Sequence, residues 1–129
     1  MRAIRWRFFG AALFGLAIFI SGFWLRGVGK PYDQLVFNAH KLIALAAVVV
    51  LIVILVRAGR TARLRGNEIT AAVVNGLFFL GLFVTGGLTS ALTPVPTVVR
   101  QLHHVLPYLV VFSTAWTLFL LGRTRRYKR

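Results

Sequence analysis

The segment VFNAHKLIALAAVVVLIVILV, residues 36–56, decides the fold of this chain. It contains one cationic residue, Lys41, and no acidic residue. A helix rises about 1.5 Å per residue, so about 20 apolar residues cross the hydrocarbon core of a bilayer, which is about 30 Å thick. The segment therefore predicts a transmembrane helix, with His40 near its beginning.

Three more segments have the same apolar character, and they cover approximately residues 8–25, 69–92 and 98–121. The chain of 129 residues is 58% hydrophobic, has a mean hydropathy of +0.79 and contains only two acidic residues, Asp33 and Glu68. A soluble domain of this size needs a charged surface that this composition does not provide. We therefore expect an all-α integral membrane protein with a single transmembrane domain over residues 1–129.

The connections between these segments are short and contain turn-forming residues. Residues 27–35 include Gly29, Pro31 and Asp33, and residues 93–97 read TPVPT, with two prolines that stop a helix. Short connections place neighbouring helices antiparallel, so the sequence predicts an up-down four-helix bundle. No internal repeat is evident.

The net charge of +14 is distributed unevenly over the two sides that this topology defines. Twelve cationic residues fall on one side: Arg2, Arg5, Arg7, Arg57, Arg60, Arg63, Arg65, Arg123, Arg125, Arg126, Lys128 and Arg129. Four fall on the other side: Arg26, Lys30, Lys41 and Arg100. Cationic residues concentrate on the cytoplasmic side, so we expect a multi-pass protein of the bacterial inner membrane with both termini cytoplasmic. The basic segments suit the anionic lipid bilayer surface, and no nucleic-acid partner is expected.

The chain has three histidines, His40, His103 and His104, and all lie near the outer ends of predicted helices. In the expected topology the second and fourth helices run parallel to each other. His40 and His103 lie about four and five residues past the starts of their helices, which places both about 6–8 Å below the outer boundary. An ionisable side chain inside a membrane helix is a functional candidate. Facing histidines in a helical bundle suit a haem with two imidazole ligands.

Small and cationic residues near the same depth are further candidates for a haem site. Ala44 shares a helical face with the histidine of its helix, and Gly22 and Gly86 lie near the outer ends of the first and third helices. These small residues suit a porphyrin edge and close helix packing equally well. Arg100 is the preferred partner for haem propionates and Lys41 is the second choice, although snorkelling to lipid headgroups explains either cation as well.

Two adjacent histidines cannot both face one cofactor, because neighbours on a helix point about 100° apart. The pattern of faces on the fourth helix leaves His103 and His104 as alternatives. Two short motifs bear on the choice: N-x-H-K at residues 38–41 and L-H-x-x-x-P-Y at residues 102–108. They resemble the corresponding helices of small bacterial four-helix membrane proteins related to b-type cytochromes of the cytochrome b561 and ferric-reductase-like kind.

This resemblance implies that His40 and His103 are the axial iron ligands of haem b, with His104 as a hydrogen-bond donor to a propionate. Cytochrome b561 proteins stack two haems on four histidines, with one pair near each side of the membrane. This chain has no histidine in its inner half, so the resemblance implies one haem near the outer face.

The expected function is one-electron transfer, because two imidazoles fill both axial positions of the iron. A quinone or a periplasmic or membrane redox partner would exchange the electron, and no catalytic constellation suggests a stand-alone enzyme. Two alternatives remain open. One is a zinc or copper site formed by the three histidines, and the other is a non-redox membrane scaffold or subunit whose histidines hold helices together. The sequence does not indicate the oligomeric state.

Overall fold

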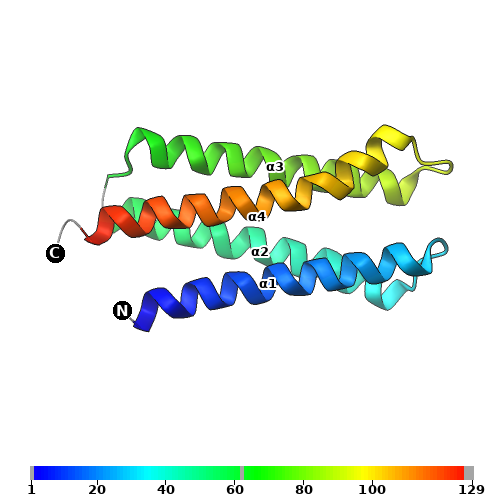
Figure 1. Ribbon diagram of the computed structural model, residues 1–129, viewed down its shortest axis with the longest axis horizontal. Coiled ribbons are helices and arrows are strands. Elements are labelled where there is room, and N and C mark those ends of the chain that lie inside the picture. Colours follow the sequence, from blue (N-terminus) through cyan, green and yellow to red (C-terminus); the bar gives the residue numbers. More distant parts are fainter. Residues whose placement is uncertain (1, 62, 127–129) are drawn as a thin grey trace. The chain divides into compact units, whose positions relative to one another are not determined.

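The computed structural model is all-helical, as the sequence predicts, and it describes the backbone of residues 2–61 and 63–126. Four helices follow one another along the chain: α1 (Arg2–Val28), α2 (Gln34–Thr61), α3 (Gly66–Ala91) and α4 (Thr97–Arg126) (Figure 1). Each helix begins before its predicted segment, and all but α3 extend past the predicted end. The apolar stretch marks only the part of a helix suited to hydrocarbon, whereas backbone hydrogen bonding continues into the flanking polar residues.

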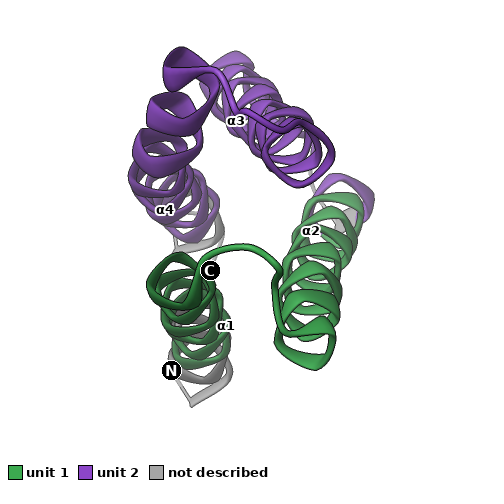
Figure 2. Cartoon of the chain, turned by 90° about the vertical axis from the view of Figure 1, so that its right-hand side faces the viewer, with its two compact units in different colours: residues 1–57 green, residues 58–129 purple. Residues whose placement is uncertain are grey.

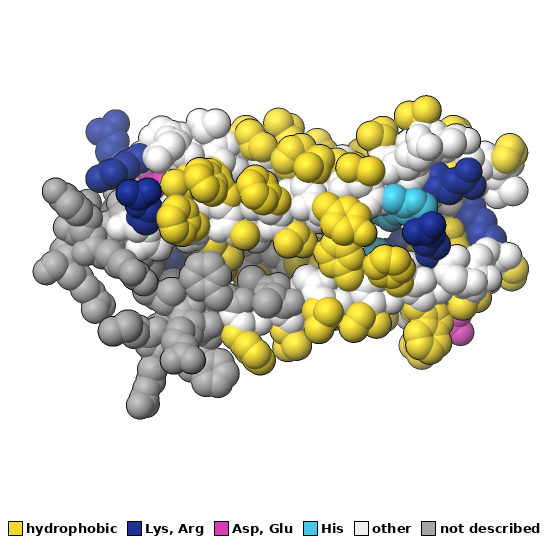
Figure 3. Space-filling model, viewed as in Figure 1, with side chains coloured by type: hydrophobic (Ala, Val, Ile, Leu, Met, Phe, Trp, Pro, Cys, Tyr) yellow, Lys and Arg dark blue, Asp and Glu magenta, His cyan; other side chains and the backbone are white. Residues whose placement is uncertain are grey.

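Within the residues whose side chains are described, three helices contain segments that are long and apolar enough to cross a membrane: Gln34–Arg60, Gly66–Ala91 and Thr97–Arg123. In α1 the described part includes the apolar segment Leu13–Val28. Figure 3 shows hydrophobic side chains over the middle of the helices and Lys and Arg side chains towards the helix ends. By the length and composition of these helices, the chain is a membrane protein.

The side chains are distributed as in a protein that contacts lipid. Large apolar side chains are exposed along the helices, with Leu35 at 81% and Phe112 at 72%. The largest fully buried side chains in the described part of the chain are polar: Glu68, Asn75 and Thr117. A soluble domain shows the opposite distribution, so the exposed faces suit a hydrocarbon environment.

The chain divides into two compact units, residues 1–57 and residues 58–129 (Figure 2). The first unit contains α1 and most of α2, and we name this pair of helices hairpin one. The second unit contains α3 and α4, which pack against each other and form hairpin two. Within each hairpin a short loop joins the two helices, as the sequence predicts, while the up-down four-helix bundle and the single transmembrane domain over residues 1–129 stay predictions.

Gly29 and Asp33 determine how α1 ends and how α2 begins. Gly29 has a φ of +71°, which residues with a Cβ rarely adopt, and its N–H donates a hydrogen bond to the Leu25 carbonyl at 3.1 Å. Asp33 caps α2, because its Oδ1 accepts a hydrogen bond from the Val36 N–H at 3.0 Å. The loop that joins the helices of hairpin one is therefore set by the turn residues that the sequence indicates.

Glu68 closes the start of α3, and its replacement should weaken hairpin two. Its Oε2 accepts a hydrogen bond from the Arg65 N–H at 2.8 Å, and the side chain is buried. Glu68→Ala leaves that N–H without its acceptor, so we expect the free energy of unfolding to fall by about 0.5–2 kcal/mol. Thermal unfolding in detergent micelles measures the loss. Glu68→Gln keeps an acceptor oxygen and is the control; equal stability of Glu68→Ala and the parent protein would contradict the capping role.

Candidate functional site

His40 lies between the two helices of hairpin one. Its Nδ1 is 2.8 Å from the hydroxyl oxygen of Ser21 on α1. The next residue of α1 is Gly22, where a Cβ atom would lie 3.4 Å from His40 Cε1. The missing side chain at Gly22 therefore lets the imidazole lie close to the α1 backbone.

His103 is held in the same way in hairpin two. Its Nδ1 is 3.1 Å from Thr85 Oγ1 on α3, and a Cβ atom at Gly86 would lie 3.0 Å from His103 Cε1. In each hairpin, a hydroxyl residue, the glycine that follows it and a histidine of the next helix thus form one arrangement. We name this arrangement a histidine seat. The first seat is Ser21, Gly22 and His40, and the second seat is Thr85, Gly86 and His103.

The hydroxyl of each seat hydrogen-bonds to its own helix and to the imidazole. Ser21 Oγ donates to the Ala17 carbonyl at 2.8 Å, and Thr85 Oγ1 donates to the Gly81 carbonyl at 2.7 Å. The direction of each bond to the imidazole depends on which ring nitrogen carries the proton. With the proton on Nδ1, the ring donates to the hydroxyl oxygen and Nε2 can bind a metal ion.

The two seats share a short sequence pattern. A Ser-Gly or Thr-Gly pair precedes a loop that contains Pro31 or Pro94, and the histidine follows that proline by nine residues. The hydroxyl residue and the histidine are 19 residues apart in hairpin one and 18 apart in hairpin two. Few residue types are shared, so the pattern becomes evident only from the matching hydrogen bonds.

The other predicted site residues lie near the starts of α2 and α4. The Lys41 ammonium nitrogen is 3.9 Å from the centroid of the Phe37 ring, a distance typical of a cation–π contact. Ala44 follows the histidine of α2 by about one turn and is half-buried, whereas Arg100 and His104 are exposed. The proposed roles of these residues towards a haem stay predictions.

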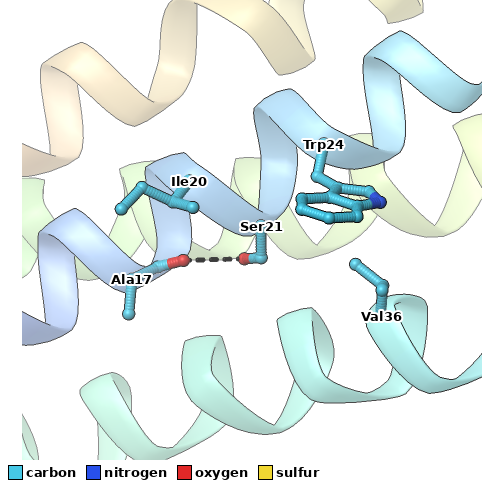
Figure 4. A pocket seen from close by; sticks show the side chains of 5 residues that line it. All are labelled: Ala17, Ile20, Ser21, Trp24 and Val36. Carbon is cyan, nitrogen blue, oxygen red and sulfur yellow. Dashed lines mark hydrogen bonds between the residues drawn. The ribbon is translucent and has the colours of Figure 1, made fainter.

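A shallow apolar groove lies beside the first seat. It is lined by Ala17, Ile20, Ser21 and Trp24 of α1 and by Val36 of α2 (Figure 4). Ser21 supplies the only hydroxyl, and its proton is directed to the Ala17 carbonyl along the dashed line in Figure 4. The groove therefore offers apolar contact and suits an acyl chain or a flat apolar surface better than a charged group.

A second polar cluster lies in hairpin two, ten residues along α3 from Thr85. Asn75 is fully buried, and its Oδ1 accepts hydrogen bonds from Ser113 at 2.7 Å and from Thr114 at 3.1 Å. Thr117, which is also fully buried, donates to the Ser113 carbonyl at 2.8 Å. The two bonds to Asn75 join α3 to α4, as polar side chains do between membrane helices, whereas the Thr117 bond lies within α4.

Among the residues whose side chains the structure describes, no three His, Cys, Asp or Glu residues are gathered as a metal site. No family model matches the chain, and no curated protein or solved structure is significantly similar to it. The fold and the seats define a class: a helical membrane protein in which each of two hairpins presents one histidine. The resemblance to b-type cytochromes, suggested by the motifs at residues 38–41 and 102–108, stays a prediction.

Gly86→Ala is expected to disturb the second seat more than Gly22→Ala disturbs the first. An added Cβ would lie 3.0 Å from His103 Cε1, which forces the ring to move, whereas the corresponding distance to His40 is 3.4 Å. The ring ¹⁵N chemical shifts of protein that contains ¹⁵N-labelled histidine, measured in micelles, report the change at each imidazole. Larger shifts at His40 in Gly22→Ala than at His103 in Gly86→Ala would contradict the geometry of the two seats.

Proposed function

We propose that this protein is a b-type membrane cytochrome that binds one haem through His40 and His103 and transfers single electrons. The observation that carries the proposal is the pair of histidine seats. In each seat a hydroxyl lies beside Nδ1, so Nε2 is the nitrogen that we propose binds iron, and two imidazole nitrogens are the donor set of a low-spin haem iron. The hydroxyl behind each Nδ1 is the kind of outer partner that orients a metal-bound histidine.

The residues around the seats fit this cofactor in the chemistry that they supply. Bound haem would provide one-electron redox chemistry, which the side chains of this protein do not provide themselves. Arg100 and Lys41 are the candidates to bind the propionates, because both are exposed cations near the starts of the helices that carry the ligands. His104 is an additional donor candidate. Ala44 is small enough to leave room beside His40.

The proposed arrangement in the membrane is an up-down bundle of four helices, with α1 as the fourth span and both termini cytoplasmic. The distribution of twelve cationic residues on one side and four on the other supports this orientation. In this orientation both seats belong to the periplasmic half of the bacterial inner membrane. A quinol in the bilayer, or a periplasmic or membrane redox protein, is then the partner that reaches the haem.

A non-redox membrane scaffold is the second candidate, and one observation favours it. The bonds from Ser21 to His40 and from Thr85 to His103 each join two helices, as the Asn75 cluster does. Polar bonds of this kind stabilise contacts between membrane helices without binding any ligand. In that role the histidines would be structural only.

The absorption spectrum of the purified, dithionite-reduced protein separates the two functions. After expression in haem-sufficient cells, we expect the sharp bands of low-spin haem b. A preparation that stays colourless, even after haem is supplied to the folded protein, would favour the scaffold and overturn the cytochrome proposal.

A further inference from the structure

We infer that Ser21 and Thr85 are matched positioning residues. They hold His40 and His103 in the tautomer with the proton on Nδ1, and they set how strongly Nε2 of each histidine donates to iron. The redox consequence of this inference rests on the proposed haem function. Its structural part concerns the apoprotein and stands independently. Neither hydroxyl would touch the iron, so each acts through its histidine.

Iron on Nε2 requires the ring proton on Nδ1, and each seat then forms a short chain of hydrogen bonds that points in one direction. In hairpin one, His40 Nδ1–H would donate to Ser21 Oγ at 2.8 Å, and Ser21 Oγ donates to the Ala17 carbonyl. Hydrogen bonds in such a chain polarise one another, so the hydroxyl oxygen becomes a better acceptor. A better acceptor at Nδ1–H makes Nε2 a more basic ligand. The hydroxyl therefore raises the donor strength of the nitrogen on the opposite side of the ring.

The same arrangement recurs in hairpin two, where His103 Nδ1 lies 3.1 Å from Thr85 Oγ1 and Thr85 Oγ1 donates to the Gly81 carbonyl. The recurrence indicates that the two hairpins are repeats of one histidine-presenting unit.

The two seats are matched but not identical. The distance from the hydroxyl oxygen to Nδ1 is 2.8 Å at Ser21 and 3.1 Å at Thr85. The shorter bond is the stronger of the two, so removal of the Ser21 hydroxyl should have the larger effect. The Thr85 hydroxyl should act in the same direction with a smaller effect.

The experiment compares Ser21→Ala and Thr85→Val with Ser21→Thr and Thr85→Ser. The first two variants remove a hydroxyl, and the last two exchange the hydroxyl residues between the seats. Loss of either hydroxyl should lower ferric haem affinity by about 10- to 100-fold. The midpoint potential should rise by about 59 mV for each tenfold decrease in the ratio of ferric to ferrous haem affinity. The exchange variants should retain the parent potential.

Ring ¹⁵N chemical shifts of the apoprotein provide a readout that needs no haem. Both His40 and His103 should show a protonated Nδ1 in the parent protein, and each should lose this preference when its own hydroxyl is removed. Unchanged shifts and an unchanged potential in Ser21→Ala and Thr85→Val would overturn the inference even if haem binds. If the chemical shifts change as predicted but the protein binds no haem, the positioning role of the hydroxyls stands and the cytochrome function is rejected.

Discussion

Replacement of His40 or His103 with alanine is expected to abolish stable haem binding, and each substitution alone should be sufficient. Either substitution removes one of two axial nitrogens, and no other described side chain of the same seat can replace an imidazole. The loss should exceed the roughly 100-fold effect that outer-shell substitutions have on metal affinity. Titration of the detergent-solubilised apoprotein with haemin, followed by absorption spectroscopy, measures the affinity and shows whether low-spin bands form.

His104→Ala is the matched control for these substitutions, because it removes an adjacent imidazole from the same helix. His104 is exposed, and the hydroxyl of the second seat bonds to His103. We therefore expect His104→Ala to keep the low-spin bands with at most a small change in affinity. Retention of those bands in His103→Ala together with their loss in His104→Ala would show that His104, and not His103, is the ligand.

Labelling of single cysteines should place the two hairpin loops on the periplasmic side and the connection between the hairpins on the cytoplasmic side. The chain has no native cysteine, so each introduced thiol reports alone. Lys30→Cys and Thr93→Cys should react with a membrane-impermeant maleimide in intact cells. Arg63→Cys should react only after the membrane is permeabilised, because cationic segments remain on the cytoplasmic side.

Ala3→Cys extends this test to α1, which we propose as the fourth membrane span. If α1 crosses the membrane, position 3 lies on the cytoplasmic side and is protected in intact cells. Labelling of Ala3→Cys together with Lys30→Cys in intact cells would show that α1 does not cross. Protection of Thr93→Cys with labelling of Arg63→Cys would reverse the proposed orientation.

The helices were predictable from the sequence because hydropathy over about twenty residues sets their number and order. Their ends were not, since helical hydrogen bonding continues into the basic residues after Val56 and Leu121. The turn residues Gly29 and Asp33 were recognisable from their chemistry. Backbone preference and apolar length are local properties, and a sequence records local properties directly.

Only part of the candidate site was predictable from the sequence. Three histidines in an apolar chain are conspicuous, and the resemblance selected His40 and His103 among them. The partners Ser21 and Thr85 were not identified, because a bond across two helices depends on helix rotation and on the length of the loop. Gly22 and Gly86 were expected as small residues near a haem. The structure shows that the imidazoles themselves lie next to the positions where a Cβ atom would be.

Titration of the purified apoprotein with haemin, followed by electron paramagnetic resonance of the ferric product, tests most directly whether His40 and His103 share one iron. We expect saturation at one haem per chain and a low-spin signal from two imidazole ligands. Saturation at two haems per chain, a high-spin signal at every stoichiometry, or no binding would contradict this expectation.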